Sequence, residues 1–151
     1  MLIYEKTFEK ARKKINEILK KNPEEKITFT SEDDDLNRKT LEKLGDKISA
    51  LLIIQSDRKD FMKQRNSGFN HVLAKVAQKQ KVLIGICLDE IIEKKGKERA
   101  EILARTKQNI KICNKNKLRM KFMQTNNPRN IYDLKALGKV LEMPTKMIKF
   151  L

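Results

Sequence analysis

The chain has few of the residues that build catalytic and metal sites. It contains one histidine, two cysteines and no tryptophan, and aromatic residues make up only 5% of its 151 residues. Cys87 and Cys113 lie far apart and form no CxxC pair, so we expect reduced thiols of an intracellular protein and no bound metal. The scarcity of aromatic residues argues against a platform on which single-stranded bases would stack.

Long apolar runs are also missing. Charged residues follow directly after Met1–Tyr4, and no stretch approaches the roughly 20 apolar residues that span a bilayer. We therefore expect a cytoplasmic protein without a signal peptide or a membrane partner. The length predicts one domain, residues 1–151.

The common enzyme motifs are absent as well. The sequence has no GxGxxG, no P-loop glycine–lysine pair and no GxSxG. Asp33–Asp35 is interpreted as an acidic helix start and not as a cation site, because no neighbouring residue completes an oxygen cage. His71 could be a general base, an RNA contact or a structural hydrogen-bonding residue, and no partner carboxylate is evident. We predict no catalytic residue and no metal ligand.

Positive charge is abundant. Lysine and arginine number 35 against 20 acids, which gives a net charge of +15 and a pI near 9.9. Residues 58–81 hold seven basic residues and one acid, and residues 94–121 hold eleven and two, so these stretches carry the whole excess. A polyanion, most simply a nucleic acid, is the expected partner. The alternative is a lysine-rich surface that serves only solubility.

Short apolar runs alternate with segments of helical periodicity. Strands are predicted at residues 2–4, 27–30, 48–54, 82–88 and 120–123. Helices are predicted at residues 7–21, 31–45, 69–80, from 91 up to a break at Gly96, at 97–116, at 132–141 and after Pro144. Val72 and Val140 are expected to face the core. This order predicts an α/β protein with parallel strands and right-handed crossovers. About five strand–helix units are too few for a closed eight-stranded barrel, so we expect a shortened or incomplete TIM-barrel-like fold.

The loop that starts at Arg58 combines basic residues with polar groups at a helix start. Helix N-termini offer free N–H groups and a partial positive charge to phosphate. Loops at the carboxyl ends of parallel strands also carry the working residues of such folds. The predicted RNA-binding residues are Arg58, Lys59, Lys63, Arg65, Ser67, Asn70, His71, Lys75, Arg105, Lys107, Lys111, Lys115, Lys117 and Arg129. Lys107, Lys111 and Lys115 are spaced to form a stripe on one helix face.

Three segments together resemble a known family. These are residues 65–71 (RNSGFNH) with the strand 82–85, the helix 104–117 with its pattern RxxxNIxxxxKxK, and the closing segment 127–141 with PR and LKALGKVL. In this order and spacing the chain resembles the archaeal and eukaryotic ribonuclease P protein component 3 family. It departs from the family in its short length, its poorly matching first half and Glu142, where the family often has glycine.

The resemblance implies a barrel-like subunit of ribonuclease P, which removes the 5′ leader from precursor tRNA. In this group the ribonuclease P RNA does the chemistry with Mg²⁺, and the protein itself binds no cofactor. The resemblance also implies pairing with ribonuclease P protein component 2 and contact with precursor tRNA within the complex. Two other functions stay open. One is a free-standing protein that binds structured RNA, and the other is a degenerate barrel phosphoesterase that uses His71.

Overall fold

Five short parallel strands form the centre of the computed structural model, which describes residues 1–151. Their order in the sheet is their order in the chain, so each strand pairs with the next in parallel. The strands are β1 (Leu2–Tyr4), β2 (Thr28–Thr30), β3 (Ala50–Leu52), β4 (Leu83–Cys87) and β5 (Met120–Met123). This sequential parallel order is that of a strand–helix barrel.

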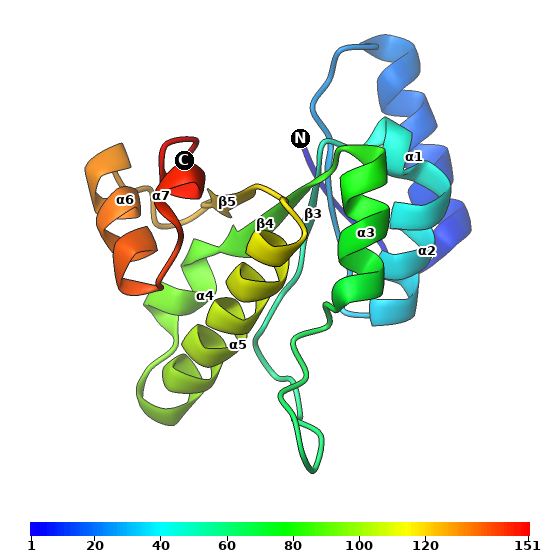
Figure 1. Ribbon diagram of the computed structural model, residues 1–151. Helices are drawn as coiled ribbons and strands as arrows, with labels where there is room; N and C mark the ends of the chain where they lie inside the picture. The colour runs from blue at the N-terminus through cyan, green and yellow to red at the C-terminus, as the bar shows by residue number, and fades with distance from the viewer.

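The helices follow the sheet in chain order, from α1 and α2 on the right of Figure 1, through α3 and α5 in front, to α6 and α7 on the left. Neighbours in this series pack together: α1 on α2, α2 on α3, and α3 on α5. The helices are α1 (Phe8–Lys21), α2 (Asp34–Leu44), α3 (His71–Gln80), α4 (Leu88–Glu93), α5 (Gly96–Lys115), α6 (Ile131–Val140) and α7 (Thr145–Ile148), and a 3-10 turn covers Gly45–Lys47.

One row of side chains across the sheet forms the centre of the core. The register aligns Ile3, Phe29, Leu51, Ile84 and Met120 on successive strands. All five are at most 2% exposed. Burying such side chains is the main favourable term in folding, at about 1.5–3 kcal/mol each. Because the strands are parallel and in this register, their carboxyl ends lie side by side. The loops that carry the candidate site begin at these ends.

The sheet does not close into a barrel. β1 pairs only with β2, and β5 pairs only with β4, so both edges lack a second strand. On the face opposite the core row, Leu2 and Tyr4 of β1 are 49% and 41% exposed. The predicted α/β class with five strand–helix units and an incomplete barrel is confirmed.

Several boundaries and faces differ from the sequence predictions. The third strand, predicted at 48–54, covers only Ala50–Leu52, because the chain turns at its end into a long loop. Val72 and Val140, predicted to face the core, are 68% and 70% exposed. Each lies on the outer side of its helix, although the periodicity of apolar residues in the sequence had placed it on the inner side.

Two further features concern membrane spans and reactive cysteines. No helix of the structure combines the length and apolar character needed to cross a bilayer. Cys113 is fully buried in the last turn of α5, and burial raises the pKa of its thiol because the charged thiolate would lose its hydration. Cys87 ends β4 and its pKa is also raised by burial, so neither thiol is primed as a nucleophile.

Candidate nucleic-acid interface

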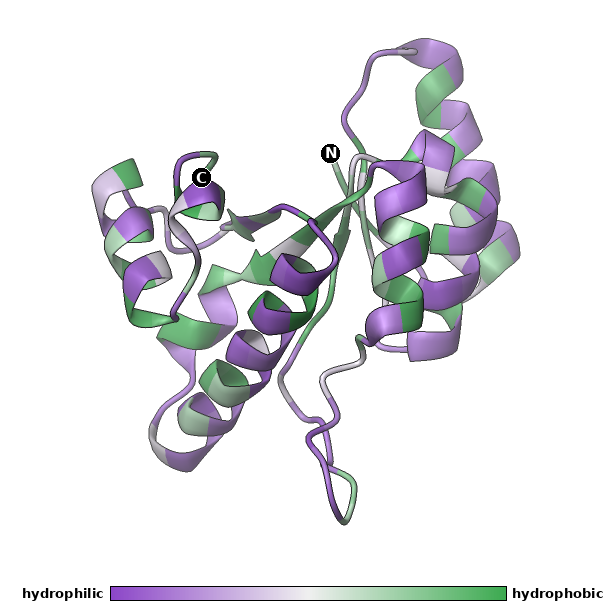
Figure 2. Ribbon diagram, in the orientation of Figure 1, coloured by the Kyte–Doolittle hydropathy of each residue, from purple (hydrophilic) through white to green (hydrophobic).

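The most prominent surface feature is the loop of residues 53–70, which joins β3 to α3 and projects away from the body of the molecule (Figure 1). We call it the basic loop. Loops longer than about 12–15 residues without secondary structure are uncommon and are usually functional or disordered. The part of the loop that projects is hydrophilic except for a short stretch at its tip (Figure 2). The tip residues Phe61 and Met62 are 57% and 99% exposed.

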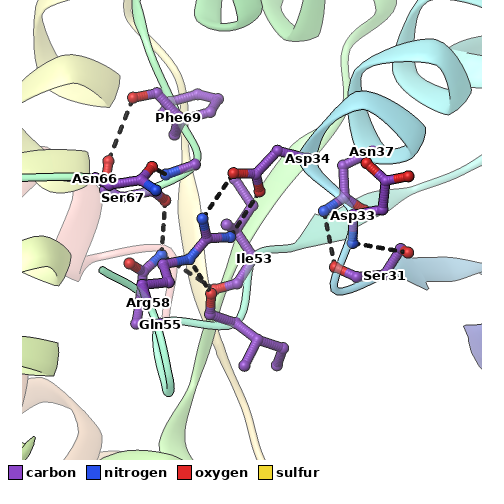
Figure 3. Close-up of polar contacts among 12 residues, drawn as sticks. Ser31, Asp33, Asp34, Asn37, Ile53, Gln55, Arg58, Asn66, Ser67 and Phe69 are labelled. Carbon is purple, nitrogen blue, oxygen red and sulfur yellow. Dashed lines mark hydrogen bonds and ion pairs between the residues drawn. The ribbon is translucent and has the colours of Figure 1, made fainter. Parts of the chain in front are cut away.

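An ion pair with α2 holds the first half of the basic loop. The guanidinium of Arg58 donates two hydrogen bonds to the carboxylate of Asp34, at 2.8 and 2.7 Å, and its Nε donates to the carbonyl of Ile54. Figure 3 shows this fork-to-fork arrangement. The Arg58 side chain is only 10% exposed. Charge-assisted bidentate pairs of this kind fix geometry as well as adding energy.

Gly68, in the second half of the loop, packs directly against this ion pair. Its φ of +65° lies in the left-handed region. A Cβ atom there would come within 2.6 Å of both terminal guanidinium nitrogens of Arg58 and of Asp34 Oδ1. The position therefore requires glycine for two reasons, backbone conformation and space.

A second buried arginine joins the basic loop to α5. Arg105 is 2% exposed and donates to the carbonyls of Gln55 and Arg58 at 3.1 and 3.0 Å, and to Asp60 Oδ1 at 3.0 Å. The hydrogen bond from Arg105, together with one from the backbone N–H of Asn66, holds the pKa of Asp60 below its usual value. The same carboxylate thus joins the outgoing and returning halves of the loop.

A buried carboxylate fixes the base of the loop. Glu90, at the start of α4, accepts hydrogen bonds from the backbone N–H groups of Gln55 and Ser56 and from the Ser56 hydroxyl, at 2.8 to 3.1 Å. Burial raises the pKa of Glu90, although these hydrogen bonds oppose the shift. The Gln55 side chain in turn donates to the carbonyl of Ser67 across the base (Figure 3). These contacts make the basic loop a fixed part of the fold.

A mostly polar groove of about 560 Å³ runs between the basic loop and helices α2, α3 and α5. It brings together Arg65, Asn70 and His71, which were predicted as RNA contacts, with Arg38 of α2 and Gln108 of α5. The Asn70 side chain accepts a hydrogen bond from the Leu73 N–H and so caps α3. The groove therefore combines two arginines, amide groups and the amino end of a helix. Asp34 and Asp35 also line it, but Asp34 is paired with Arg58 and Asp35 with Arg38, whereas Arg65 makes no ion pair.

The first turn of α3 carries no acidic residue. The first turn of α2, in contrast, contains two aspartates and is capped by the Asp33 carboxylate. The partial positive charge at the start of α2 is thus neutralised within the chain, whereas that of α3 remains available to an external anion.

His71 joins this helix start to the end of α5. Its Nδ1 lies 3.1 Å from the side-chain nitrogen of Asn116, and that amide nitrogen also donates to the carbonyl of Ile112. An amide nitrogen is a donor, so this contact is a hydrogen bond to Nδ1 in the tautomer that leaves Nδ1 unprotonated. His71 makes no ion pair with a carboxylate, so the structure offers no group that would orient it as a general base.

The predicted RNA-binding residues fall into two groups. Those with exposed side chains and no internal ion pair are Lys59, Lys63, Arg65, Asn70, His71, Lys75, Lys111, Lys115, Lys117 and Arg129. Arg58, Arg105 and Ser67 are largely buried and hydrogen-bonded inside the protein. The polar groups of these three residues already have partners inside the protein, so in this structure they support the basic loop. Their predicted contact with RNA stays a prediction.

Lys107 is a separate case. Its Nζ forms a 2.9 Å ion pair with Glu142, and this contact holds the pKa of Glu142 below its usual value. Lys107 therefore does not continue the free lysine stripe of α5, which consists of Lys111 and Lys115.

Because Lys107 is ion-paired and Lys111 and Lys115 are not, we expect their loss to change the salt dependence of RNA binding by different amounts. Each lysine that contacts a phosphate adds roughly −0.7 to −0.9 to the slope of log affinity against log salt. Replacing Lys111 and Lys115 together by glutamine should flatten the slope by about 1.5, whereas Lys107→Gln should leave it unchanged. Replacing Lys13 and Lys20 of α1 by glutamine removes the same charge elsewhere and serves as the control. Equal slopes for the two double variants would assign the α5 stripe to solubility alone.

Some residues of the site were not predicted from the sequence. Arg38 and Gln108 reach the groove from α2 and α5, and Asp34 and Glu90 hold the loop. Phe61 and Met62 had a local signal, an apolar pair between charged residues without helical or strand periodicity. Asp34, Glu90 and Gln108 had none, because their partners lie 24 or more positions away in the chain. Arg38 had none either, because its place in the groove depends on how α2 packs beside the basic loop.

A second turn at the same end of the sheet is held by Asp89. Its carboxylate accepts backbone hydrogen bonds from Thr125, Asn126 and Asn127, at 2.8 to 3.1 Å. Burial alone would raise the pKa of Asp89, but these hydrogen bonds outweigh it and the pKa is lowered. No group of three or more histidine, cysteine, aspartate or glutamate side chains is arranged to hold a metal ion. The carboxylates at this end serve to fix loops.

Comparison with known proteins yields matches among solved structures alone. No protein-family model and no curated protein sequence matches the chain. Among solved structures, the fold is similar to a chain of the cryo-EM structure of archaeal ribonuclease P with mature tRNA, with a TM-score of 0.73 and 23% sequence identity. The match covers 99% of this chain and 66% of that one, so this chain spans just under two thirds of its length. At this level of identity the likeness establishes the shared fold.

Proposed function

We propose that this chain is an RNA-binding protein subunit of a ribonuclease P ribonucleoprotein. In this role it supports removal of the 5′ leader from precursor tRNA, and the RNA performs the cleavage with Mg²⁺. The observation that carries the proposal is the fixed basic loop beside the unneutralised start of α3, on a fold shared with a chain of archaeal ribonuclease P. The three sequence segments that resemble the component 3 family support a component 3-like subunit with component 2 as its protein partner. We propose the cytoplasm as its location.

The protein contributes binding and positioning. Arg65, together with the start of α3, presents positive charge to one phosphate group, and Lys63 extends this charge along the loop. Lys111 and Lys115 contact the RNA backbone further along α5. Contacts of this kind position a structured RNA without reading its sequence.

Arg65→Ala tests the binding role. The Arg65 side chain is exposed and makes no ion pair, so its loss should leave the melting temperature nearly unchanged. Affinity for ribonuclease P RNA should fall about tenfold, which corresponds to roughly 1.4 kcal/mol for one charge-assisted contact. Arg12→Ala is the control, because this arginine is also exposed and belongs to α1, which lies apart from the basic loop in Figure 1. Its ion pair is with Glu9 of the same helix.

The same experiment shows whether Arg65 supports the fold or contacts RNA. If Arg65→Ala melts the protein and the remaining folded fraction binds RNA normally, the loop is scaffold and the assignment of the site is wrong. If both arginine variants bind equally well, the RNA contacts lie elsewhere on the surface.

The free-standing RNA-binding protein is distinguished by its choice of RNA. A ribonuclease P subunit should prefer ribonuclease P RNA over an unrelated structured RNA of equal length at the same salt concentration. Equal affinities would favour the free-standing protein. The phosphoesterase alternative has no support in the geometry, because the only side-chain partner of His71 is the Asn116 amide.

A further inference from the structure

A second large hollow lies apart from the basic loop. It is a groove of about 870 Å³ between α4, α5 and α6, and ten of its fourteen lining residues are hydrophobic. We call it the apolar groove. Its floor is buried, with Leu88 and Leu141 at 2% and 1% exposure. Its walls are open, since Ile92, Leu103 and Leu137 are only partly buried and Val140 is 70% exposed. Hydrophobic residues are visible on all three helices in Figure 2.

α5 separates the two surfaces. Gln108 and Ile112 line the polar groove, whereas Leu103 and Ala104 line the apolar groove. A contiguous exposed apolar surface costs free energy in water and in soluble proteins commonly marks an interaction site. A groove between three helices with an apolar floor can bind the apolar face of a further helix.

The rim of the apolar groove is basic. Arg99, Lys107 and Arg129 line it, against Asp133 as the only acid among the lining residues. Neither Arg99 nor Arg129 forms an ion pair, and the Arg99 guanidinium bonds only to the backbone carbonyls of Ile92 and Lys94. A second copy of this chain is a poor occupant, because it carries a net charge of +15 and the same basic rim. An RNA would leave the apolar walls exposed to water.

We propose that the apolar groove binds an amphipathic helix of a protein partner, with apolar residues along one face and acidic residues beside them. The apolar face covers Leu103, Leu137 and Val140, and the acidic residues pair with Arg99 and Arg129. This proposal goes beyond the RNA-binding function and uses a different surface. The chain then has two working sides, the basic loop for RNA and the apolar groove for protein.

The test uses synthetic peptides of about 18 residues, which span five helical turns. The probe has leucine at positions i, i+3, i+4 and i+7 of the helix and glutamate beside this face. One control peptide has serine in place of leucine, and a second has lysine in place of glutamate. Binding to the full chain is measured by fluorescence anisotropy at 0.3 M salt, where the Debye length is below about 8 Å and non-specific attraction to the basic surface is weak.

The variants are Val140→Gln and Val72→Gln. Both valines lie on helices and are about equally exposed, at 70% and 68%, but only Val140 lines the groove. Both variants should keep the melting temperature of the parent protein. We expect the acidic amphipathic peptide to bind, Val140→Gln to weaken binding about tenfold, which is roughly 1.4 kcal/mol, and Val72→Gln to have no effect. Both control peptides should bind at least about tenfold more weakly.

Three results would overturn the proposal. Equal binding of the serine peptide would show attraction by charge alone. Equal effects of the two valine variants would place the peptide outside the groove. Self-association of the chain that Val140→Gln abolishes would identify a second copy as the occupant.

Discussion

Replacing Gly68 by alanine should destabilise the protein and release the basic loop. The left-handed backbone costs a residue with a Cβ about 1–2 kcal/mol. The new methyl group would also displace the Arg58–Asp34 pair, which it would approach within 2.6 Å, and leaving these partly buried groups unsatisfied costs about 1–3 kcal/mol. Together these effects should lower the free energy of unfolding by about 2–4 kcal/mol and the melting temperature by roughly 5–15 °C.

Gly96→Ala is the matched control for this prediction. Gly96 also has a positive φ, of +54°, but no atom lies within 4 Å of the position that a Cβ would occupy. It should therefore show only the backbone cost, about 1–2 kcal/mol. Thermal unfolding followed by circular dichroism measures both. If the two variants lose the same stability, the close packing of Gly68 on the ion pair contributes nothing, and the account of how the loop is held is wrong.

Arg105→Ala should detach the basic loop from α5. The arginine is 2% exposed, and its loss leaves the carbonyls of Gln55 and Arg58 and the Asp60 carboxylate without their donor. Hydrogen bonds from a charged donor contribute about 1.5–3 kcal/mol each, so we expect a loss of about 2–4 kcal/mol once the loop relaxes into water. The loop itself should become mobile, because Arg105 contacts both ends of residues 55–60.

Limited trypsin digestion measures this release directly. Lys59, Lys63 and Arg65 are cleavage sites in the loop, and cleavage there should become at least about tenfold faster, because it follows the population of the open state. Lys111→Ala on the same helix removes an exposed cation and should change neither stability nor cleavage. A variant that keeps both its melting temperature and its resistance to trypsin but loses RNA binding would restore Arg105 as an RNA contact.

The strands and helices could be predicted from the spacing of apolar residues in the sequence, because this spacing reflects which face of each element is buried. Met120 and Phe122 alternate with Lys121 and predicted β5 with its observed bounds. The same reasoning was wrong for Val72 and Val140, since the periodicity of a short helix does not determine how wide its buried face is. Both valines lie outside the buried face and are exposed.

The placement of charged residues could not be predicted in this way. Arg58 and Lys59 are neighbours in a basic stretch, yet the first is paired with Asp34 and the second is exposed. What decides between them is a partner 24 positions earlier in the chain. Arg105 likewise depends on acceptors 45 to 50 positions away. Charge counts locate a basic region, but only the fold separates the cations that hold the loop from those left free for a phosphate.

The basic loop lies at the carboxyl end of the sheet because it follows β3, and long-range contacts hold it there. Glu90 and Asp89 follow β4, and each fixes the loop or turn after a neighbouring strand, at Ser56 and Asn127 respectively. Parallel strands bring these segments to one edge. Adjacent acidic residues in the sequence thus fix two neighbouring loops and need no metal ion or catalytic role to explain their burial.

The proposed role in ribonuclease P is tested most directly by reconstitution. Cleavage of precursor tRNA by ribonuclease P RNA and protein component 2 is measured at limiting Mg²⁺, with this chain, without it and with the Arg65→Ala variant. The account predicts that the wild-type chain increases the cleavage rate, that the variant increases it less at equal concentration, and that the chain alone does not cleave. A rate that is the same with and without the wild-type chain, at concentrations that saturate its binding to the RNA, would contradict it.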